Sequence, residues 1–289
     1  MPNLTLTHKT LIFIVLTLAV IITLRVGSAR LIILKEFVKL EEELSQQNMG
    51  RLFAAVNREC EVMARILGDW CDWNNTLEFL EGKRPGYEAD NLTTHTFVNL
   101  GLHLLVLAGA VEADAELTGA TEKFHWAGVY LPDEDVLAPL APETARYLMQ
   151  TSTLWEHPTA DSRKVGLLQT PMGLMLVASG PIGNSENEGP VGGTLIMARH
   201  FDTAAVAALE EQMQMEISIA PLMDPPSEAM GSPHAHAHLS HSAIAVIPID
   251  DDTLRATAVI ADMTGRPAAQ VSVKAPRDIV AQGHRTINY

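Results

Sequence analysis

The N-terminal part of this chain carries an uncharged apolar run that most limits how the chain can fold. Residues 11–24 hold no charged side chain, and Lys9 and Arg25 flank them. The run is shorter than the about 20 residues that a membrane-spanning helix prefers. Arg25 can extend its charge to the membrane interface, and Val26 with residues 31–34 lengthens the apolar segment. The pattern therefore predicts a helix that crosses a lipid bilayer.

A cleaved signal peptide is the alternative interpretation of this segment, with cleavage near the small residues 27–29. Arg25 lies where the approach to a cleavage site should be uncharged. This favours an uncleaved anchor over residues 11–30, after a cytoplasmic tail of residues 1–10. Both interpretations export the rest of the chain, so we expect a protein of the inner (cytoplasmic) membrane with an extracytoplasmic, periplasmic domain.

The composition limits the other partners of the chain. Its 289 residues suggest one large domain or two small ones, and with 47% apolar residues it can bury a sizeable core. The net charge of −15 argues against a nucleic-acid partner, because phosphate contacts need a basic surface. An acidic surface mainly favours solubility of the exported part.

The two cysteines, Cys60 and Cys71, give little information about compartment. On one helix they would share a face but lie roughly 16 Å apart along the axis, which is beyond the span of a disulfide. A bridge would need the helix to end between them. Two cysteines also give no tetrahedral zinc pattern.

Apolar residues at helical spacing predict a long helix over residues 31–67. The stripe contains Phe37, Leu40, Leu44, Leu52, Val56, Cys60, Met63, Leu67 and Trp70. Such a narrow seam either packs on its own domain or pairs with a second copy of the chain. We expect both, with the N-terminal half forming a homodimer and the C-terminal half packing on the domain. Gly68 and Asp69 suggest a break, with Asp69 capping the next turn.

The rest of the sequence predicts an antiparallel sheet with flanking helices, an α+β fold. Short apolar runs broken by glycine and proline predict strands at 102–108, 125–130, 165–169, 174–179, 193–198, 216–220, 243–249, 255–260 and 269–273. Helices are expected from Asn91, from Pro142 to Met149, from Asp202, which would cap its helix, and from Pro276. Residues 221–242 lack apolar periodicity and predict an exposed loop.

One stretch resembles the opening signature of the CHASE4 family. It contains Asp69-Trp70 and Trp73-Asn74, followed by Phe79, Tyr87, Asn91 and Leu92. The downstream pattern Gly189-Pro190-x-Gly192-Gly193, with Arg199, Asp202, residues 262–267, Arg277 and Gly283, is similar to the same family. The resemblance covers roughly residues 43–288.

The resemblance implies an extracytoplasmic sensor domain over residues 68–275, with a fold related to PAS-like and Cache domains. It also implies a helix over residues 276–289 that leads to a second membrane span. The output would be cytoplasmic, such as a histidine kinase or a diguanylate cyclase. The chain holds neither the second span nor an output domain, so we expect a fragment, a truncated product or a stand-alone sensor.

The candidate ligand-binding residues mix aromatic faces with hydrogen-bonding groups, as small-molecule sites do. They are Trp73, Asn74, Tyr87, Asn91 and Arg199. Trp70 and Trp73 are expected to be mostly buried and to join the long helix to the sheet. Asn74-Asn75 and Leu77 depart from the family pattern, where acidic residues and an aromatic residue are usual, and this weakens any transfer of ligand chemistry.

A histidine cluster supports the alternative function, an anchored periplasmic enzyme or metal-binding protein. His234, His236, His238 and His241 lie in the expected loop, and imidazoles bind divalent metals. No acidic or cysteine ligand stands at a fixed spacing from them. Motifs for nucleophilic catalysis, phosphate binding and dinucleotide binding are absent from the sequence, so we expect no enzymatic activity and no cofactor in this chain.

Overall fold

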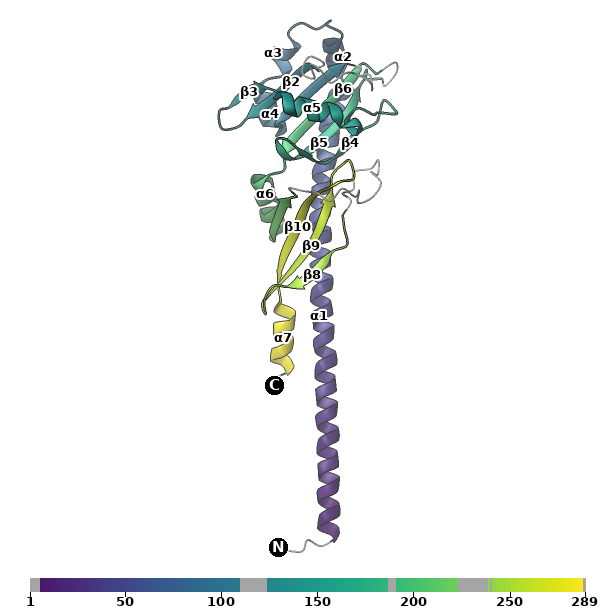
Figure 1. The fold of residues 1–289 in the computed structure, drawn as a ribbon, viewed down its shortest axis with the longest axis vertical. Coiled ribbons are helices and arrows are strands. Elements are labelled where there is room, and N and C mark those ends of the chain that lie inside the picture. The colour runs from purple at the N-terminus through teal and green to yellow at the C-terminus, as the bar shows by residue number, and fades with distance from the viewer. Residues whose placement is uncertain (1–5, 110–123, 187–190, 223–238, 240, 288–289) are drawn as a thin grey trace. The chain divides into compact units, whose positions relative to one another are not determined.

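The computed structural model describes residues 6–109, 124–186, 191–222, 239 and 241–287, and only the backbone of residues 7–9, 26, 28–34 and 284–287. Its internal contacts divide it into two compact units. The first unit comprises residues 1–48, 246–256 and 274–289, and the second comprises residues 49–245 and 257–273. Figure 1 labels the helices and strands of the two units in chain order.

Helix α1 (Leu6–Cys71) is continuous, so the break expected at Gly68 and the capping role expected for Asp69 are both wrong. The backbone N–H of Asp72 donates to the carbonyl of Gly68 over 2.9 Å. A glycine inside a helix costs only about 1 kcal/mol. Leu67 and Cys71 on either side are fully buried, and their burial outweighs that cost.

The N-terminal part of α1 exposes its apolar side chains. Leu11 is 62% exposed, Leu16 is 63% exposed and Leu24 is 68% exposed. Among the residues that the structure describes, no helix provides a stretch that is both long and apolar enough to cross a membrane.

A six-stranded antiparallel sheet forms the centre of the second unit. Its strands are β1 (Leu104–Gly109), β2 (Phe124–Leu131), β3 (Val136–Pro139), β4 (Lys164–Thr170), β5 (Gly173–Ile182) and β6 (Gly193–His200). The spatial order is β3-β2-β1-β6-β5-β4. The predicted β4-β5-β6 meander is confirmed, and β1 pairs with β6 in a register that sets Leu104 opposite Ala198. Strand β3 was not predicted.

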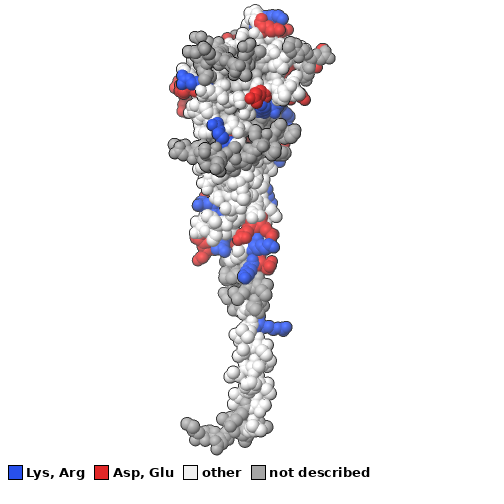
Figure 2. All heavy atoms as spheres, turned by 45° about the vertical axis from the view of Figure 1, so that its right-hand side comes forward, with Lys and Arg blue, Asp and Glu red and all other residues white. Residues whose placement is uncertain are grey.

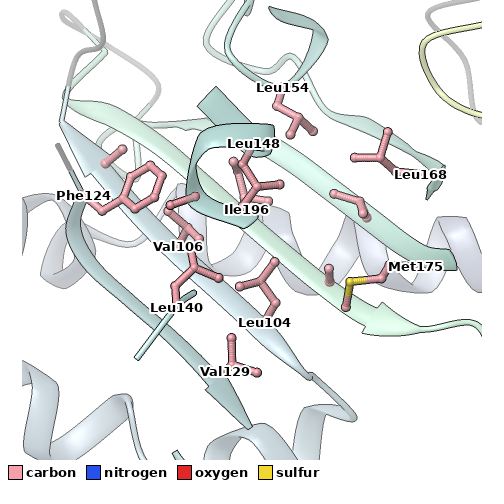
Figure 3. Close-up of a cluster of buried hydrophobic side chains, with 14 residues drawn as sticks. Leu104, Val106, Phe124, Val129, Leu140, Leu148, Leu154, Leu168, Met175 and Ile196 are labelled. Atoms are coloured by element: carbon pink, nitrogen blue, oxygen red, sulfur yellow. The ribbon is translucent and has the colours of Figure 1, made fainter. Parts of the chain in front are cut away.

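Both faces of this sheet are covered, which explains the almost uninterrupted apolar run of β1. One face packs under α5 (Pro142–Gln150) and the 3₁₀ helix η2 (Ser152–Leu154) through side chains such as Val106, Ile196 and Leu148 (Figure 3). The opposite face receives α1. A Cβ at Gly180 of β5 would lie 3.1 Å from Leu67 and 3.2 Å from the Cys71 sulfur.

Four further helices belong to the second unit: α2 (Asn74–Leu80), α3 (Tyr87–Asn91), α4 (Thr94–Leu100) and α6 (Thr203–Met213). The predicted cap of α6 is confirmed, because the Asp202 carboxylate accepts from the N–H groups of Ala204 and Ala205. Thr93 caps α4 in the same way through the N–H of Thr96. These local signals are short-range hydrogen bonds, so the sequence alone could predict them.

A second antiparallel sheet has the order β7-β10-β9-β8, with β7 (Glu216–Pro221), β8 (Ala245–Pro248), β9 (Thr253–Ala261) and β10 (Pro267–Pro276). The β9–β10 turn is closed by the Asp262 carboxylate, which accepts from the N–H groups of Thr264 and Arg266. Helix α7 (Asp278–Ile287) follows β10. The α+β class is therefore confirmed.

Candidate functional site

The signature stretch gathers aromatic rings where α1 ends and α2 and α3 follow. The rings of Trp73 and Tyr87 lie 5.9 Å apart, and Phe79 stacks on Tyr87 at 4.6 Å. Trp70 contacts Trp73 edge-on at 6.4 Å, and His125 of β2 contacts Phe79 edge-on at 4.6 Å. We refer to these five residues as the aromatic cluster.

Tyr87 is the fully buried member of the aromatic cluster. Its hydroxyl lies 2.9 Å from the Thr76 hydroxyl, which is also buried. Burial raises the pKa of Tyr87, so the phenol stays neutral and can act as a hydrogen-bond partner but not as a base. Asn91 donates its side-chain amide to the Tyr87 carbonyl over 3.0 Å, which keeps this candidate residue beside the cluster.

Trp70 and Trp73 each keep only a minor part of their surface exposed, which agrees with the expectation that both are mostly buried. The buried stripe of α1 continues from Leu67 to Cys71, one full turn later, rather than to Trp70. Trp70 therefore lies beside the fully buried stripe rather than in it. Trp73 precedes α2 with an extended backbone and therefore leaves the helix axis.

Asn74 is exposed, and its side-chain oxygen accepts from the N–H of Ser185 over 3.0 Å. The Cys71 carbonyl accepts from the N–H of Gly183 over 3.0 Å. The loop after β5 is thus tied by two hydrogen bonds to the junction between α1 and α2.

The two halves of the signature, distant in sequence, meet in space at Gly192 and Gly193. A Cβ at Gly192 would overlap the Leu77 side chain, and one at Gly193 would overlap the carbonyl oxygen of Ala108 and lie 2.8 Å from Leu80. The glycines therefore let α2 pack directly on the start of β6. Gly189 and Pro190 lie outside the described residues.

Arg199 lies apart from the other candidates. Its guanidinium donates to the Glu59 carboxylate over 2.6 Å, and Glu59 belongs to α1. Arg199 lies six positions after Gly193 in β6, which corresponds to roughly 20 Å of strand. The structure thus brings Trp73, Asn74, Tyr87 and Asn91 into one neighbourhood, and it places Arg199 elsewhere.

A pair of histidines at the ends of β1 and β6 has no counterpart in the sequence predictions. The rings of His103 and His200 lie 4.7 Å apart, and the N–H of His200 donates to His103 Nδ1 over 3.4 Å. Burial lowers the pKa of both imidazoles. They lie 97 positions apart in sequence and carry no spacing signal, so only the β1–β6 register brings them together.

The histidine segment lies almost entirely outside the described residues, which include His241 but not His234, His236 or His238. His241 stacks on Phe53 of α1 at a ring distance of 4.1 Å. Within the described part of the chain, no three His, Cys, Asp or Glu residues are placed to hold a metal ion. Cys60 and Cys71 are free and buried, and burial raises the pKa of each thiol to about 12.

Comparison with known proteins gives a family match and several remote similarities. Residues 55–220 match the family model of the CHASE4 domain. The methanogenesis regulatory histidine kinase FilI of Methanothrix harundinacea is 27% identical over 248 residues, which are 86% of this chain and 26% of that protein. The chain thus spans about a quarter of the length of this relative.

Two solved sensor domains show remote similarity. The periplasmic domain of Vibrio cholerae LuxQ aligns with a TM-score of 0.46 at 14% identity, over 80% of this chain and 99% of that domain. The periplasmic sensory domain of the Campylobacter jejuni chemoreceptor Tlp1 aligns with a TM-score of 0.42 at 13% identity, over 83% of this chain and 95% of that domain.

Proposed function

Because the chain belongs to the CHASE4 domain family, we propose that it is the extracytoplasmic ligand-sensing domain of a signal-transduction protein. The observation that carries the proposal is the family match over residues 55–220, which contains both halves of the signature. These halves pack together where α2 meets Gly192 and Gly193. The domain itself needs no catalytic group for this function, since binding energy alone can bias a conformational equilibrium.

The ligand site that we propose is the accessible side of the aromatic cluster. Trp73 is half-buried and His125 is exposed, so aromatic surface remains available beside the closed Tyr87 ring. Asn74 and Asn91 would add hydrogen bonds, because aromatic faces with a few polar groups suit a small organic ligand. Arg199 would take part only through an anionic ligand that replaces the Glu59 carboxylate.

The experiment is a thermal-shift screen of small organic compounds against the whole chain. A compound present at 100 times its Kd should stabilise the fold by about 2.7 kcal/mol. Trp73→Leu should abolish the shift, whereas Trp126→Leu serves as a matched control because Trp126 is another half-buried tryptophan. A hit that keeps its full shift in Trp73→Leu would overturn the proposed site.

We further propose that residues 11–30 anchor the domain in the cytoplasmic membrane. The support is the uncharged run from Leu11 to Leu24, whose side chains are largely exposed along α1. On the face shown in Figure 2, this part of α1 is almost free of charged atoms. Exposed apolar surface of this extent in water would be unfavourable, and a bilayer would remove it.

The output of the signal is proposed to be a histidine kinase, with a diguanylate cyclase as the alternative. The support for the kinase is the similarity to FilI, a histidine kinase of which this chain matches 26%.

A homodimer would bring two copies of α1 together along Leu40 and Leu44, which are exposed. The relation to PAS-like and Cache domains stays a prediction.

A further inference from the structure

Within the first unit, a buried carboxylate of α1 caps the N-terminus of α7. Glu41 is only 3% exposed, although carboxylates are almost never fully buried without partners. Its Oε1 accepts from the backbone N–H of Val280, in the first turn of α7, over 2.7 Å. Its Oε2 lies 3.4 Å from Nε of Arg277, the residue that precedes α7. A helix thus receives its N-terminal cap from another helix rather than from its own chain segment.

Arg277 connects this cap to the turn between β8 and β9. Its backbone N–H donates to the Asp252 carbonyl over 2.8 Å, and its Nη1 donates to the Asp250 carbonyl over 3.3 Å. We call the pair Glu41 and Arg277 the clasp. The clasp joins three elements, which are α1, the first turn of α7 and the β8–β9 turn.

The direction of α7 follows from two contacts with α1. Val280 bonds to Glu41, and a Cβ at Gly283 would overlap the ring of Phe37. The contact partner on α1 moves backwards as the chain advances along α7, so the two helices run antiparallel here. Gly283 is needed because the Phe37 ring lies directly on the α7 backbone.

Residues 278–283, the part of α7 whose side chains are described, bury little apolar surface, so the docking of this part depends strongly on the clasp. Among the described side chains of α7, those of residues 278–283, Val280 is the one fully buried apolar side chain. A helix as short as α7 is also marginal in isolation. If α7 loses its contact with α1, it should therefore also unwind.

We propose that the Glu41–Arg277 clasp makes α7 a separately releasable element, which is ordered and docked on α1 or undocked and unwound while the sheets stay folded. A buried carboxylate with one bond to a helix N–H and one to a guanidinium has few intermediate arrangements, because half of the pair alone leaves an uncompensated charge. The clasp thus favours two discrete states. This inference rests on the first unit alone and not on the proposed ligand site.

Amide hydrogen exchange of the whole chain in detergent micelles tests the clasp, with Glu41→Ala compared with wild type. Glu41→Ala should raise exchange at Val280 and Ala281 about tenfold or more, because it removes a charge-assisted hydrogen bond. Glu41→Gln keeps an acceptor for Val280 and should give a smaller increase. Glu42→Ala is the matched control, since Glu42 is the exposed neighbour on the same helix.

Two results would overturn the clasp. The first is unchanged exchange in α7 of Glu41→Ala. The second is faster exchange in β5 and β6 together with α7, which would make Glu41 a residue of general stability.

As a second route, Gly283→Ala should also raise exchange in α7, and Phe37→Ala in the same chain should reverse most of that increase. A failure of this rescue contradicts the antiparallel contact.

Discussion

At the scale of single residues, the signature consists of complementary shapes rather than a set of reactive groups. Gly192 and Gly193 lack side chains where Leu77 and Leu80 of α2 reach the sheet. Trp73 of the aromatic cluster directly precedes α2. A ligand that displaced Trp73 would therefore act on the segment that positions α2.

We expect Gly193→Ala to destabilise the second unit by about 2 to 3 kcal/mol, because the new Cβ overlaps the backbone oxygen of Ala108, which cannot rotate away. Chemical denaturation followed by circular dichroism measures the change. The control is Gly109→Ala on the paired strand, where a Cβ meets nothing within 4 Å. Equal losses in the two variants would contradict the close approach.

His157 should make stability depend on pH. Burial, and to a lesser extent the charge of Lys164, lowers its pKa from 6.5 to about 4. The unfolded chain therefore binds a proton first as the pH falls, so stability is fully present above pH 6.5 and is lost towards pH 4. After discounting for partial exposure, the loss is about 2 kcal/mol.

Urea denaturation at pH 7 and pH 4.5 measures this effect in wild type and in His157→Gln. The variant should lose less stability between the two pH values, since glutamine does not titrate. His95→Gln, which changes an exposed histidine, should behave as wild type. A pH response of His157→Gln equal to that of wild type would refute the assignment.

The contacts of some residues could be predicted from their neighbours in sequence, and the contacts of others could not. The cap of Asp202 follows from neighbours in sequence, and the structure confirms it. The contact of His103 with His200 depends on the register of β1 and β6, and the contact of Arg199 with Glu59 depends on how α1 packs on β6. No local sequence pattern encodes either contact. Ligand binding by Trp73 stays a prediction.

At the scale of elements, the first unit assigns two faces of α1 to different partners. Glu41 and Ser45 are buried within the unit, and Phe37 contacts Gly283 of α7. Leu40 and Leu44 point elsewhere and are 44% and 39% exposed. Phe37 of the predicted seam thus packs on α7, whereas Leu40 and Leu44 remain exposed. The sequence could not show this, because periodicity shows that a face is apolar but not which partner covers it.

Single cysteines should test the proposed dimer face. Leu40→Cys and Leu44→Cys should form disulfide-linked dimers in membranes more readily than Glu42→Cys, since they lie one turn apart on the open face. The native Cys60 and Cys71 are buried, and burial raises their pKa to about 12, so they give little background. Equal cross-linking at all three positions would rule out this seam.

At the scale of the whole molecule, the α+β class and most strands of the sequence prediction hold, whereas the break at Gly68 does not. A glycine next to an aspartate is a weak local signal, and the burial of Leu67 and Cys71 overrides it. Strand β3 was missed because it is short and half-exposed. The segment divisions at residues 30, 67 and 275 stay predictions.

The whole chain, expressed in bacteria, should remain in the membrane pellet after an alkaline carbonate wash. Leu16→Arg combined with Val20→Arg should release it, because each arginine near the centre of a span costs about 2.5 to 3.5 kcal/mol. Val98→Arg, at an exposed site of α4, should leave the pellet unchanged. Extraction of the wild-type chain by carbonate would contradict the anchor.

The order of the six-stranded sheet also means that two central strands, β1 and β6, are synthesised far apart in time. β1 leaves the ribosome about ninety residues before β6, its central partner. The edge of β1 that will pair with β6 therefore has no partner strand until the β4–β5–β6 meander has been synthesised, although β1 is apolar. Such an edge is a template for association between nascent chains. During synthesis, residues 104–109 must therefore be kept from pairing with other chains until β6 has been made.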